Sequence, residues 1–201
     1  MIRLIFAIIL FVTTEVTFAK SNIVVLGDSI SAGYGLEAGQ GWVVLIDKKL
    51  QAGSDCCVII NESISGDTSS GGLARIDPIL SNHHPKILVI ELGANDGLHG
   101  LPPALLKKNI SEIIHRAQKI DTKVLLLGMK IMPNYGKRYT DMFYQVYPQI
   151  AKELDVPIIP FTLEGIALDK DLMQADGLHP NAKAQPLIAD KVWHYLKPLL
   201  K

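Results

Sequence analysis

The sequence has no excess of charge of either sign, because 20 lysine and arginine residues balance 20 aspartate and glutamate residues. A neutral chain lacks the positive field that attracts nucleic acid or an anionic membrane. The chain also has no internal repeats or low-complexity segments, and 48% of its 201 residues are hydrophobic. This composition is typical of a globular protein. We therefore expect one domain and no nucleic-acid partner.

Cysteine is scarce: Cys56 and Cys57 are the two in the chain, and they are adjacent. Neighbouring side chains in an extended strand point apart, which disfavours a disulfide between them. We interpret both as small apolar residues at the start of a strand. The six histidines lack the spacing to cysteines or acidic residues that a metal site needs. We expect neither a metal nor another cofactor.

No apolar run reaches the ~20 residues that a helix needs to span a bilayer. The N-terminus instead combines Arg3, an apolar run over residues 4–12 and a small residue at Ala19. This three-part pattern is typical of a secretory signal peptide. We expect cleavage of residues 1–19 and one mature domain over residues 20–201. The mature protein would be exported, periplasmic or secreted, and would not stay inserted in the membrane.

Five short runs rich in branched aliphatic residues predict strands at residues 23–26, 58–61, 87–91, 124–127 and 156–160. The runs are continuously apolar, as in parallel strands covered on both faces. Helical patterns occupy residues 42–50, 73–80, 102–119, 141–154 (weakened by Pro148) and 182–196. The alternation predicts a three-layer α/β/α sandwich around a five-stranded parallel sheet. Its common strand order, 2-1-3-4-5, puts the ligand crevice at the carboxyl ends of strands 1 and 3.

Candidate reactive residues follow the first three expected strands. Ser29 follows the first within GDS, Gly66 follows the second, and Asn95 follows the third within GAND. Each alone has an ordinary explanation: Ser29 as a helix cap, Gly66 as a turn glycine, and Asn95 as a loop residue that bonds to the local backbone. Together at one edge they favour a nucleophile with two oxyanion donors. We interpret Asp28 as the organiser of the turn and Thr68, after the second Gly-Asp pair, as a helix cap.

A candidate base for Ser29 lies far along the chain, in the segment ADGLHPNA. Asp176 and His179 stand three residues apart there, so the carboxylate can hold one imidazole nitrogen and leave the other free. These residues predict a Ser-His-Asp relay. The N–H groups of Ser29 and Gly66 and the amide of Asn95 would then hold the oxyanion.

The four motifs together resemble the SGNH, or GDSL-type, hydrolases. The family's blocks are matched, in order, by GDSISAGYG at residues 27–35, by Gly66 within SISGDTS, by GAND at 93–96 and by DGLHP at 176–180. The sequence is most similar to an exported bacterial thioesterase, lysophospholipase and arylesterase subgroup. The resemblance implies a flavodoxin-like sandwich, Ser29 as nucleophile, and Asp176 and His179 as its triad partners. It also implies Gly66 and Asn95 as oxyanion donors, and hydrolysis of acyl esters and thioesters.

The segment GMKIMPNYGKRY follows the fourth expected strand. Its flexible apolar side chains fit the wall of an acyl channel, although Met129 and Ile131 are equally explained as core residues. The candidate substrate-binding residues are Met129, Ile131, Met132, Pro133 and Tyr135.

Two other functions fit the same motifs. One is a carbohydrate O-acetyl esterase with the same triad and a smaller, more polar pocket. The other is a non-catalytic lipid- or glycan-binding module. Because export removes the protein from cytosolic acyl-CoA, we expect a lysophospholipid or another small acyl ester as substrate. We also expect a monomer whose activity falls in acid as His179 takes up a proton.

Overall fold

The computed structural model describes residues 21–53 and 57–201. The expected signal peptide and Cys56 lie outside these residues, whereas Cys57 is buried at the start of a strand. Within the two described ranges, no helix has the length and apolar character needed to cross a membrane.

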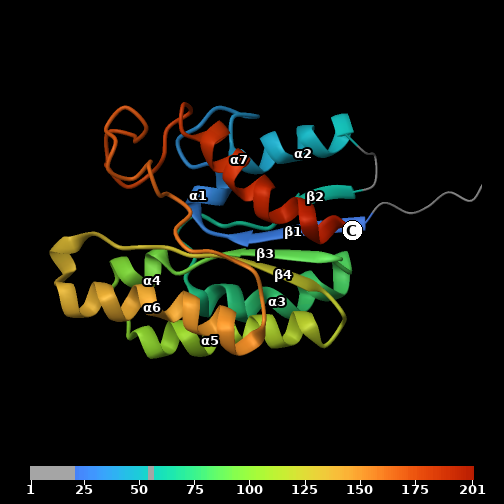
Figure 1. Ribbon diagram of the computed structural model, residues 1–201, viewed down its shortest axis with the longest axis horizontal. Helices are drawn as coiled ribbons and strands as arrows, with labels where there is room; N and C mark the ends of the chain where they lie inside the picture. The colour runs from blue at the N-terminus through green and yellow to red at the C-terminus, as the bar shows by residue number, and fades with distance from the viewer. Residues whose placement is uncertain (1–20, 54–56) are drawn as a thin grey trace, which may run out of the picture.

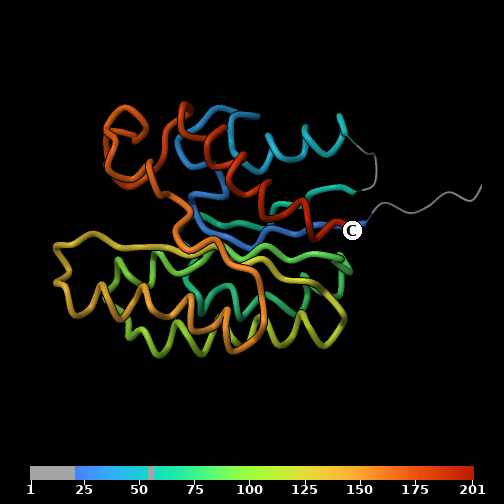
Figure 2. The backbone as a smooth tube through the Cα atoms, in the orientation of Figure 1, coloured from blue at the N-terminus to red at the C-terminus, as the bar shows by residue number. Residues whose placement is uncertain are grey.

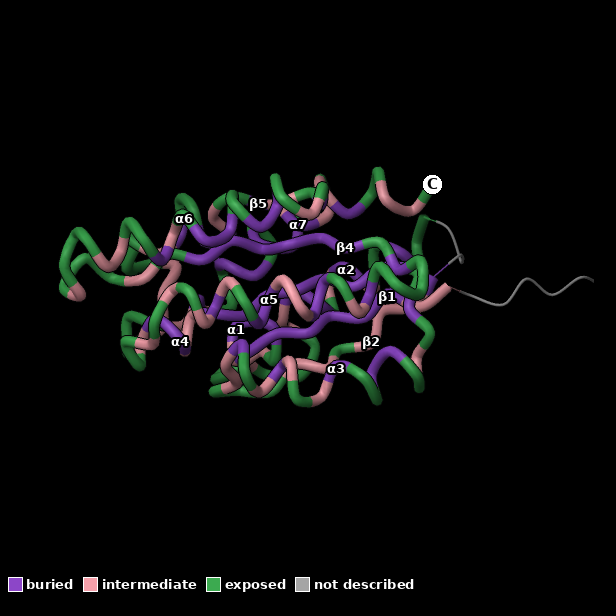
Figure 3. Tube along the Cα trace, turned by 90° about the horizontal axis from the view of Figure 1, so that it is seen from below, coloured by how far each residue is buried: buried purple, intermediate pink, exposed green. Residues whose placement is uncertain are grey.

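Five parallel strands form one sheet in the order β2-β1-β3-β4-β5, which confirms the order expected from the sequence. Both faces of the central strands are buried, and the tube coloured by burial shows this as a continuous core (Figure 3). Burial on both faces explains why these strands are continuously apolar in sequence. The strands are β1 (Ser21–Gly27), β2 (Cys57–Asn61), β3 (Ile87–Glu91), β4 (Lys123–Leu127) and β5 (Ile158–Ile159).

Helices cover both faces of the sheet and complete the expected three layers (Figures 1 and 2). One face carries α1 (Ser29–Ala32), α2 (Trp42–Gly53) and α7 (Gln185–Leu196), with α2 packed on α7. The other face carries α3 (Ser69–His83), α4 (Ala94–Leu98), α5 (Pro103–Gln118) and α6 (Lys137–Leu154). Two short 3-10 helices, η1 (Pro133–Tyr135) and η2 (Lys197–Leu200), complete the described elements.

Proline explains two differences from the expected boundaries. The fifth strand was expected over residues 156–160 but contains only Ile158 and Ile159. The flanking Pro157 and Pro160 have no backbone N–H to donate to a neighbouring strand, so the strand cannot extend past them. Pro148, by contrast, lies inside an unbroken α6. The buried face of α6 (Phe143, Val146, Tyr147, Ile150 and Ala151) packs on the sheet and outweighs the missing backbone bond.

The sheet register brings the predicted reactive residues to one edge. Gly27, the last residue of β1, pairs with Glu91, the last residue of β3. The segments that follow these strands therefore leave the sheet side by side. In Figure 1 they lie at the left end, opposite the chain's C-terminus, with the loops that follow β4 and β5.

Candidate active site

Ser29 begins a one-turn helix at the carboxyl end of β1. Asp28 caps this helix, since its Oδ1 accepts a hydrogen bond from the N–H of Ile30 at 3.0 Å. Gly33 ends the helix with a φ of +78°, a left-handed conformation that suits glycine. Because Asp28 is the cap, the hydroxyl of Ser29 is not needed for capping and is available for chemistry.

Asp176 and His179 face each other within a single turn. Oδ1 of Asp176 accepts hydrogen bonds from the backbone N–H groups of Leu178 (2.9 Å) and His179 (3.0 Å), and Oδ2 lies 2.7 Å from Nδ1 of His179. Partial desolvation acts to raise the pKa of Asp176, but the hydrogen bonds from His179 and Leu178 lower that pKa to about 2. The carboxylate is therefore ionised at neutral pH and holds the proton of His179 on Nδ1.

The imidazole of His179 links this turn to Ser29. Its Nε2 lies 2.9 Å from Oγ of Ser29. With the ring proton on Nδ1, Nε2 carries the lone pair that accepts the proton of the hydroxyl. The ring of Tyr34 packs on the imidazole with a centroid separation of 4.6 Å. The three residues expected to form a relay thus meet in one hydrogen-bonded chain.

Asn95 is linked to the residues beside Ser29 and Gly66, because its amide contacts Asp28 and Asp67. Asn95, in the first turn of α4, donates from Nδ2 to the backbone oxygen of Asp67 (2.8 Å) and to Oδ2 of Asp28 (3.2 Å). Gly66 lies in the turn between β2 and α3 with a φ of +84°, and an added Cβ would meet nothing within 4 Å. Within the described residues, the backbone N–H groups of Ser29 and Gly66 have no protein acceptor.

Thr68 takes the structural role expected for it. It caps α3, and its Oγ1 accepts a hydrogen bond from the N–H of Gly71 at 3.3 Å. The two Gly-Asp-hydroxyl phrases of the sequence therefore differ in function: the first presents Ser29 to His179, and the second begins a helix.

Two buried carboxyl groups lie next to Ser29. Asp28 is fully buried, and this burial raises its pKa to about 6, against the lowering effect of the N–H of Ile30. Glu91 is also fully buried. Burial first, and then the charge of Asp28, raise the pKa of Glu91 well above its ordinary value. Oε2 of Glu91 accepts a hydrogen bond of 2.6 Å from Oγ of Ser31.

An apolar cavity of about 510 Å³ opens beside Ser29 and His179. Met129, Ile131, Met132 and Pro133, four of the five residues expected to contact substrate, line this cavity. Tyr135 does not line it. Its hydroxyl instead donates to the backbone oxygen of Leu98, a residue that lines the cavity, at 2.8 Å. Met129 is 2% exposed and is both a core residue and part of the wall.

Sequence reasoning missed several residues of this cavity. They share positions after β3, after β5 or in the turn that carries His179: Leu98, Phe161, Leu163, Ala167, Leu168, Met173 and Leu178. Their position at the carboxyl edge of the sheet was the available signal. Glu91 was missed as well, although a lone acidic residue at the end of the apolar run ILVIE marks it.

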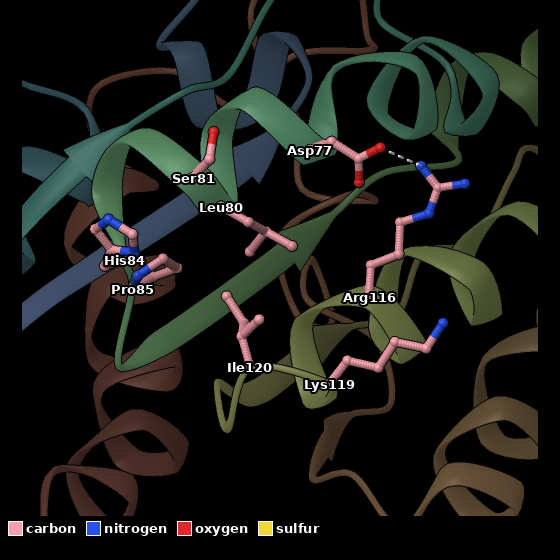
Figure 4. Close-up of a pocket in the computed structure, with 8 residues that line it drawn as sticks. All are labelled: Asp77, Leu80, Ser81, His84, Pro85, Arg116, Lys119 and Ile120. Carbon is pink, nitrogen blue, oxygen red and sulfur yellow. Dashed lines mark hydrogen bonds and ion pairs between the residues drawn. The ribbon is translucent and has the colours of Figure 1, made fainter.

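A second hollow of about 510 Å³ lies at the opposite end of the sheet (Figure 4). Its residues Pro85 and Ile120 precede β3 and β4, and an ion pair of 2.9 Å joins Asp77 to Arg116 along its side. Ser81 has no histidine bonded to its hydroxyl there, and donates instead to the backbone oxygen of Pro78. This hollow does not contain the chemistry that surrounds Ser29.

The described residues contain no group of three or more histidine, cysteine, aspartate or glutamate side chains placed to hold a metal ion. Ser29, His179 and Asp176 have a geometry compatible with acyl transfer. Residues 25–186 match the model of the GDSL-like lipase/acylhydrolase family. The chain belongs to this family. As a member, it is an ester hydrolase.

Individual relatives agree with this assignment. The chain is 47% identical to esterase TesA of Pseudomonas aeruginosa over 182 residues, 90% of each protein. It is 41% identical to thioesterase 1/protease 1/lysophospholipase L1 of Escherichia coli, over 90% of this chain and 86% of that protein. A crystal structure of TesA superposes with a TM-score of 0.86 at 46% identity, covering 89% of this chain and 99% of that one.

Proposed function

We propose that this protein hydrolyses acyl esters and thioesters with Ser29 as nucleophile, His179 as general base and Asp176 as the residue that orients His179. The observation that carries this proposal is the hydrogen-bonded chain from Asp176 through His179 to Ser29, with contacts of 2.7 and 2.9 Å. The oxyanion donors are the N–H groups of Ser29 and Gly66 and the side-chain amide of Asn95. Both N–H bonds of this amide are engaged in the free enzyme, so the one to the backbone oxygen of Asp67 turns to the oxyanion while the one to Asp28 stays.

In the first half of the reaction, Oγ of Ser29 attacks the acyl carbon while its proton passes to Nε2 of His179. The carbonyl oxygen becomes an oxyanion, and the three donors stabilise it. When the intermediate collapses, His179 returns the proton to the departing alcohol or thiol. The acyl group is then bound to Ser29 as an ester.

In the second half, a water molecule takes the place of the alcohol. His179 accepts one of its protons, the hydroxide attacks the acyl carbon, and the second oxyanion collapses to release the carboxylic acid. The proton on His179 returns to Oγ of Ser29. Asp176 stays ionised throughout and stabilises the imidazolium that forms at each stage.

The substrate class follows from the cavity beside Ser29. Its wall consists mainly of methionine, leucine, isoleucine and phenylalanine side chains. Each buried methylene of an acyl chain gains about 0.8 kcal/mol in such a wall. We therefore assign medium or long acyl chains to this site, with a lysophospholipid or a similar small amphiphile as substrate. The apolar wall speaks against the polar pocket of a carbohydrate O-acetyl esterase.

We also propose that the enzyme acts outside the cytoplasm as a monomer, after removal of residues 1–19. N-terminal sequencing of protein recovered from the periplasm, with size-exclusion chromatography, tests both points. A start at Lys20 and elution at the monomer mass are expected; a retained N-terminus or a larger species contradicts them.

Hydrolysis of chromogenic esters from acetyl to palmitoyl tests the main proposal, with mature protein compared against Ser29→Ala. Turnover that depends on Ser29 and peaks at medium or long chains supports it. Turnover confined to acetyl esters identifies an acetyl esterase instead. Binding of an amphiphile without any product identifies a binding module.

A further inference from the structure

Glu91 occupies an unusual position for a charged residue. It ends β3, whose other four residues are aliphatic, and it is fully buried. Its pairing with Gly27 across β1 and β3 places it next to the turn that carries Asp28 and Ser29. A carboxyl group in this position has to be explained by what surrounds it.

The surroundings do not suit an ionised side chain. Oε2 of Glu91 accepts hydrogen bonds from Oγ of Ser31 (2.6 Å) and from the N–H of Asp28 (3.4 Å). Oε1 is buried and receives no hydrogen bond from the residues that the structure describes, and no described lysine, arginine or histidine pairs with Glu91. A buried carboxylate with so few donors takes up a proton rather than remain charged.

That proton has an acceptor within reach. The N–H of Asp28 donates to Oε2 of Glu91, and the two buried side chains shift each other's pKa, that of Glu91 upward and that of Asp28 downward. Two carboxyl groups this close retain one proton between them. Asp28 uses its own oxygens to accept from the N–H of Ile30 and from Nδ2 of Asn95. A chain of hydrogen bonds thus runs from Glu91 through Asp28 to the amide of Asn95.

Other titratable groups face this carboxyl pair. Asp67 and His179 act on Asp28, the first raising and the second lowering its pKa. The buried Tyr147 interacts with both carboxyl groups, and its hydroxyl donates to the backbone oxygen of Leu92 at 3.0 Å. None of these groups forms a hydrogen bond to Glu91, so its proton remains directed to Asp28.

We propose that Glu91 is a positioning residue for the hydrolysis, a neutral acid whose proton fixes Asp28 and, through Asp28, the oxyanion donor Asn95. This inference rests on the proposed function, because Asn95 matters only if an oxyanion forms beside Ser29. The proton has an electrostatic consequence as well. Two ionised carboxylates next to the oxyanion would oppose the negative charge that develops there, whereas a pair that shares one proton carries half that charge.

Infrared spectroscopy of the mature enzyme tests the protonation state directly. Protonated carboxyl groups have a carbonyl stretch that ionised carboxylates lack. At pH 7 this band is expected in the wild type and in Glu112→Gln, and it is expected to be lost in Glu91→Gln. Glu112 is a matched control because its hydrogen bond to Arg116 lowers its pKa. The same spectrum for wild type and Glu91→Gln would overturn the inference.

Steady-state kinetics test whether Glu91 acts on the hydrolysis by positioning Asn95. A misplaced catalytic group costs about 100-fold, so Glu91→Leu is expected to lower kcat by about 10-fold to 100-fold with KM changed less than about twofold. Glu91→Gln keeps a donor toward Asp28 and is expected to recover at least about a third of kcat. In an Asn95→Ala background, Glu91→Leu is expected to cost less than about twofold, because the group it positions is already missing.

An equal loss from Glu91→Leu in both backgrounds would overturn the inference, since a purely structural role would not depend on Asn95. If Glu91→Leu does not fold, the infrared comparison of the wild type with Glu91→Gln still tests whether Glu91 is protonated. Failure of the proposed function is distinguishable: activity that survives Ser29→Ala overturns that function, whereas Ser29-dependent activity without the infrared band overturns only the role of Glu91.

Discussion

Nε2 of His179 lies 2.9 Å from Oγ of Ser29, although 150 residues separate the two along the chain. The contact joins the turn after β1 to the turn before α7. It forms because parallel strands release their carboxyl ends at one edge of the sheet. The strand topology therefore brings the residues of the proposed hydrolytic site together, and the role of each can be tested by substitution.

Asp176→Asn is expected to lower kcat by about 10³-fold to 10⁴-fold, as in other serine hydrolase triads in which the amide holds the wrong imidazole tautomer. The fold is expected to persist, because the amide oxygen still accepts from the backbone of Leu178 and His179. Steady-state kinetics with circular dichroism check this.

Asp171→Asn is the matched control for that substitution, as an exposed acidic residue in the preceding loop. It is expected to leave kcat unchanged. Equal activity of the two variants would remove Asp176 from the triad.

Ala167→Trp is expected to shorten the preferred acyl chain. Ala167 lines the cavity and is partly exposed, so the indole ring fills the acyl site without entering the core. Each methylene that loses its burial costs about 0.8 kcal/mol, or about fourfold in kcat/KM.

The ratio of octanoyl to acetyl ester hydrolysis measures this effect, with the acetyl ester as internal control. We expect a fall of at least about tenfold in that ratio from the loss of a few buried methylenes. Ala52→Trp, on the exposed end of α2, is expected to leave the ratio unchanged. An unchanged ratio in Ala167→Trp would place the acyl chain elsewhere.

The pKa of Asp28 predicts a decline in stability with rising pH. This carboxyl group has an ordinary pKa of 3.8 and a pKa of about 6 in the folded protein. Between these values the folded state binds more protons than the unfolded state, so the free energy of unfolding falls as the pH rises from about 4 to 6. The pKa of Asp176 lies below this window.

Urea denaturation of wild type and Asp28→Asn at pH 4, 5, 6 and 7 measures the contribution. The rise of the Asp28 pKa from 3.8 to about 6 corresponds to at most about 3 kcal/mol. The free energy of unfolding of the wild type, relative to the variant, is expected to fall by up to this amount across the series. A constant difference would show that Asp28 titrates normally in the folded protein.

Much of the architecture was predictable because its determinants are local. The continuous apolar runs predicted the five strands, and the general rule for such sheets gave their order and the edge where Ser29, Asn95 and His179 meet. The DGLHP spacing of Asp176 and His179 likewise requires only one turn.

Other features depend on packing between distant segments, which the sequence pattern does not contain. The short helix that carries Asn95 has too few residues for a helical period. Tyr135 turned to the backbone of Leu98 rather than into the cavity. The hydrogen-bond partners of Glu91 came from Ser31 and Asp28 on a neighbouring segment.

The most direct test of the catalytic assignment is covalent labelling of the mature enzyme by an organophosphonate ester, with the modified residue located by peptide mass spectrometry. The phosphonate resembles the tetrahedral intermediate and is attacked only by an activated nucleophile. We predict one adduct per chain, on Ser29, with loss of esterase activity in proportion to labelling and no adduct in Ser29→Ala. An adduct on another residue, or full activity in a completely labelled enzyme, would contradict the assignment.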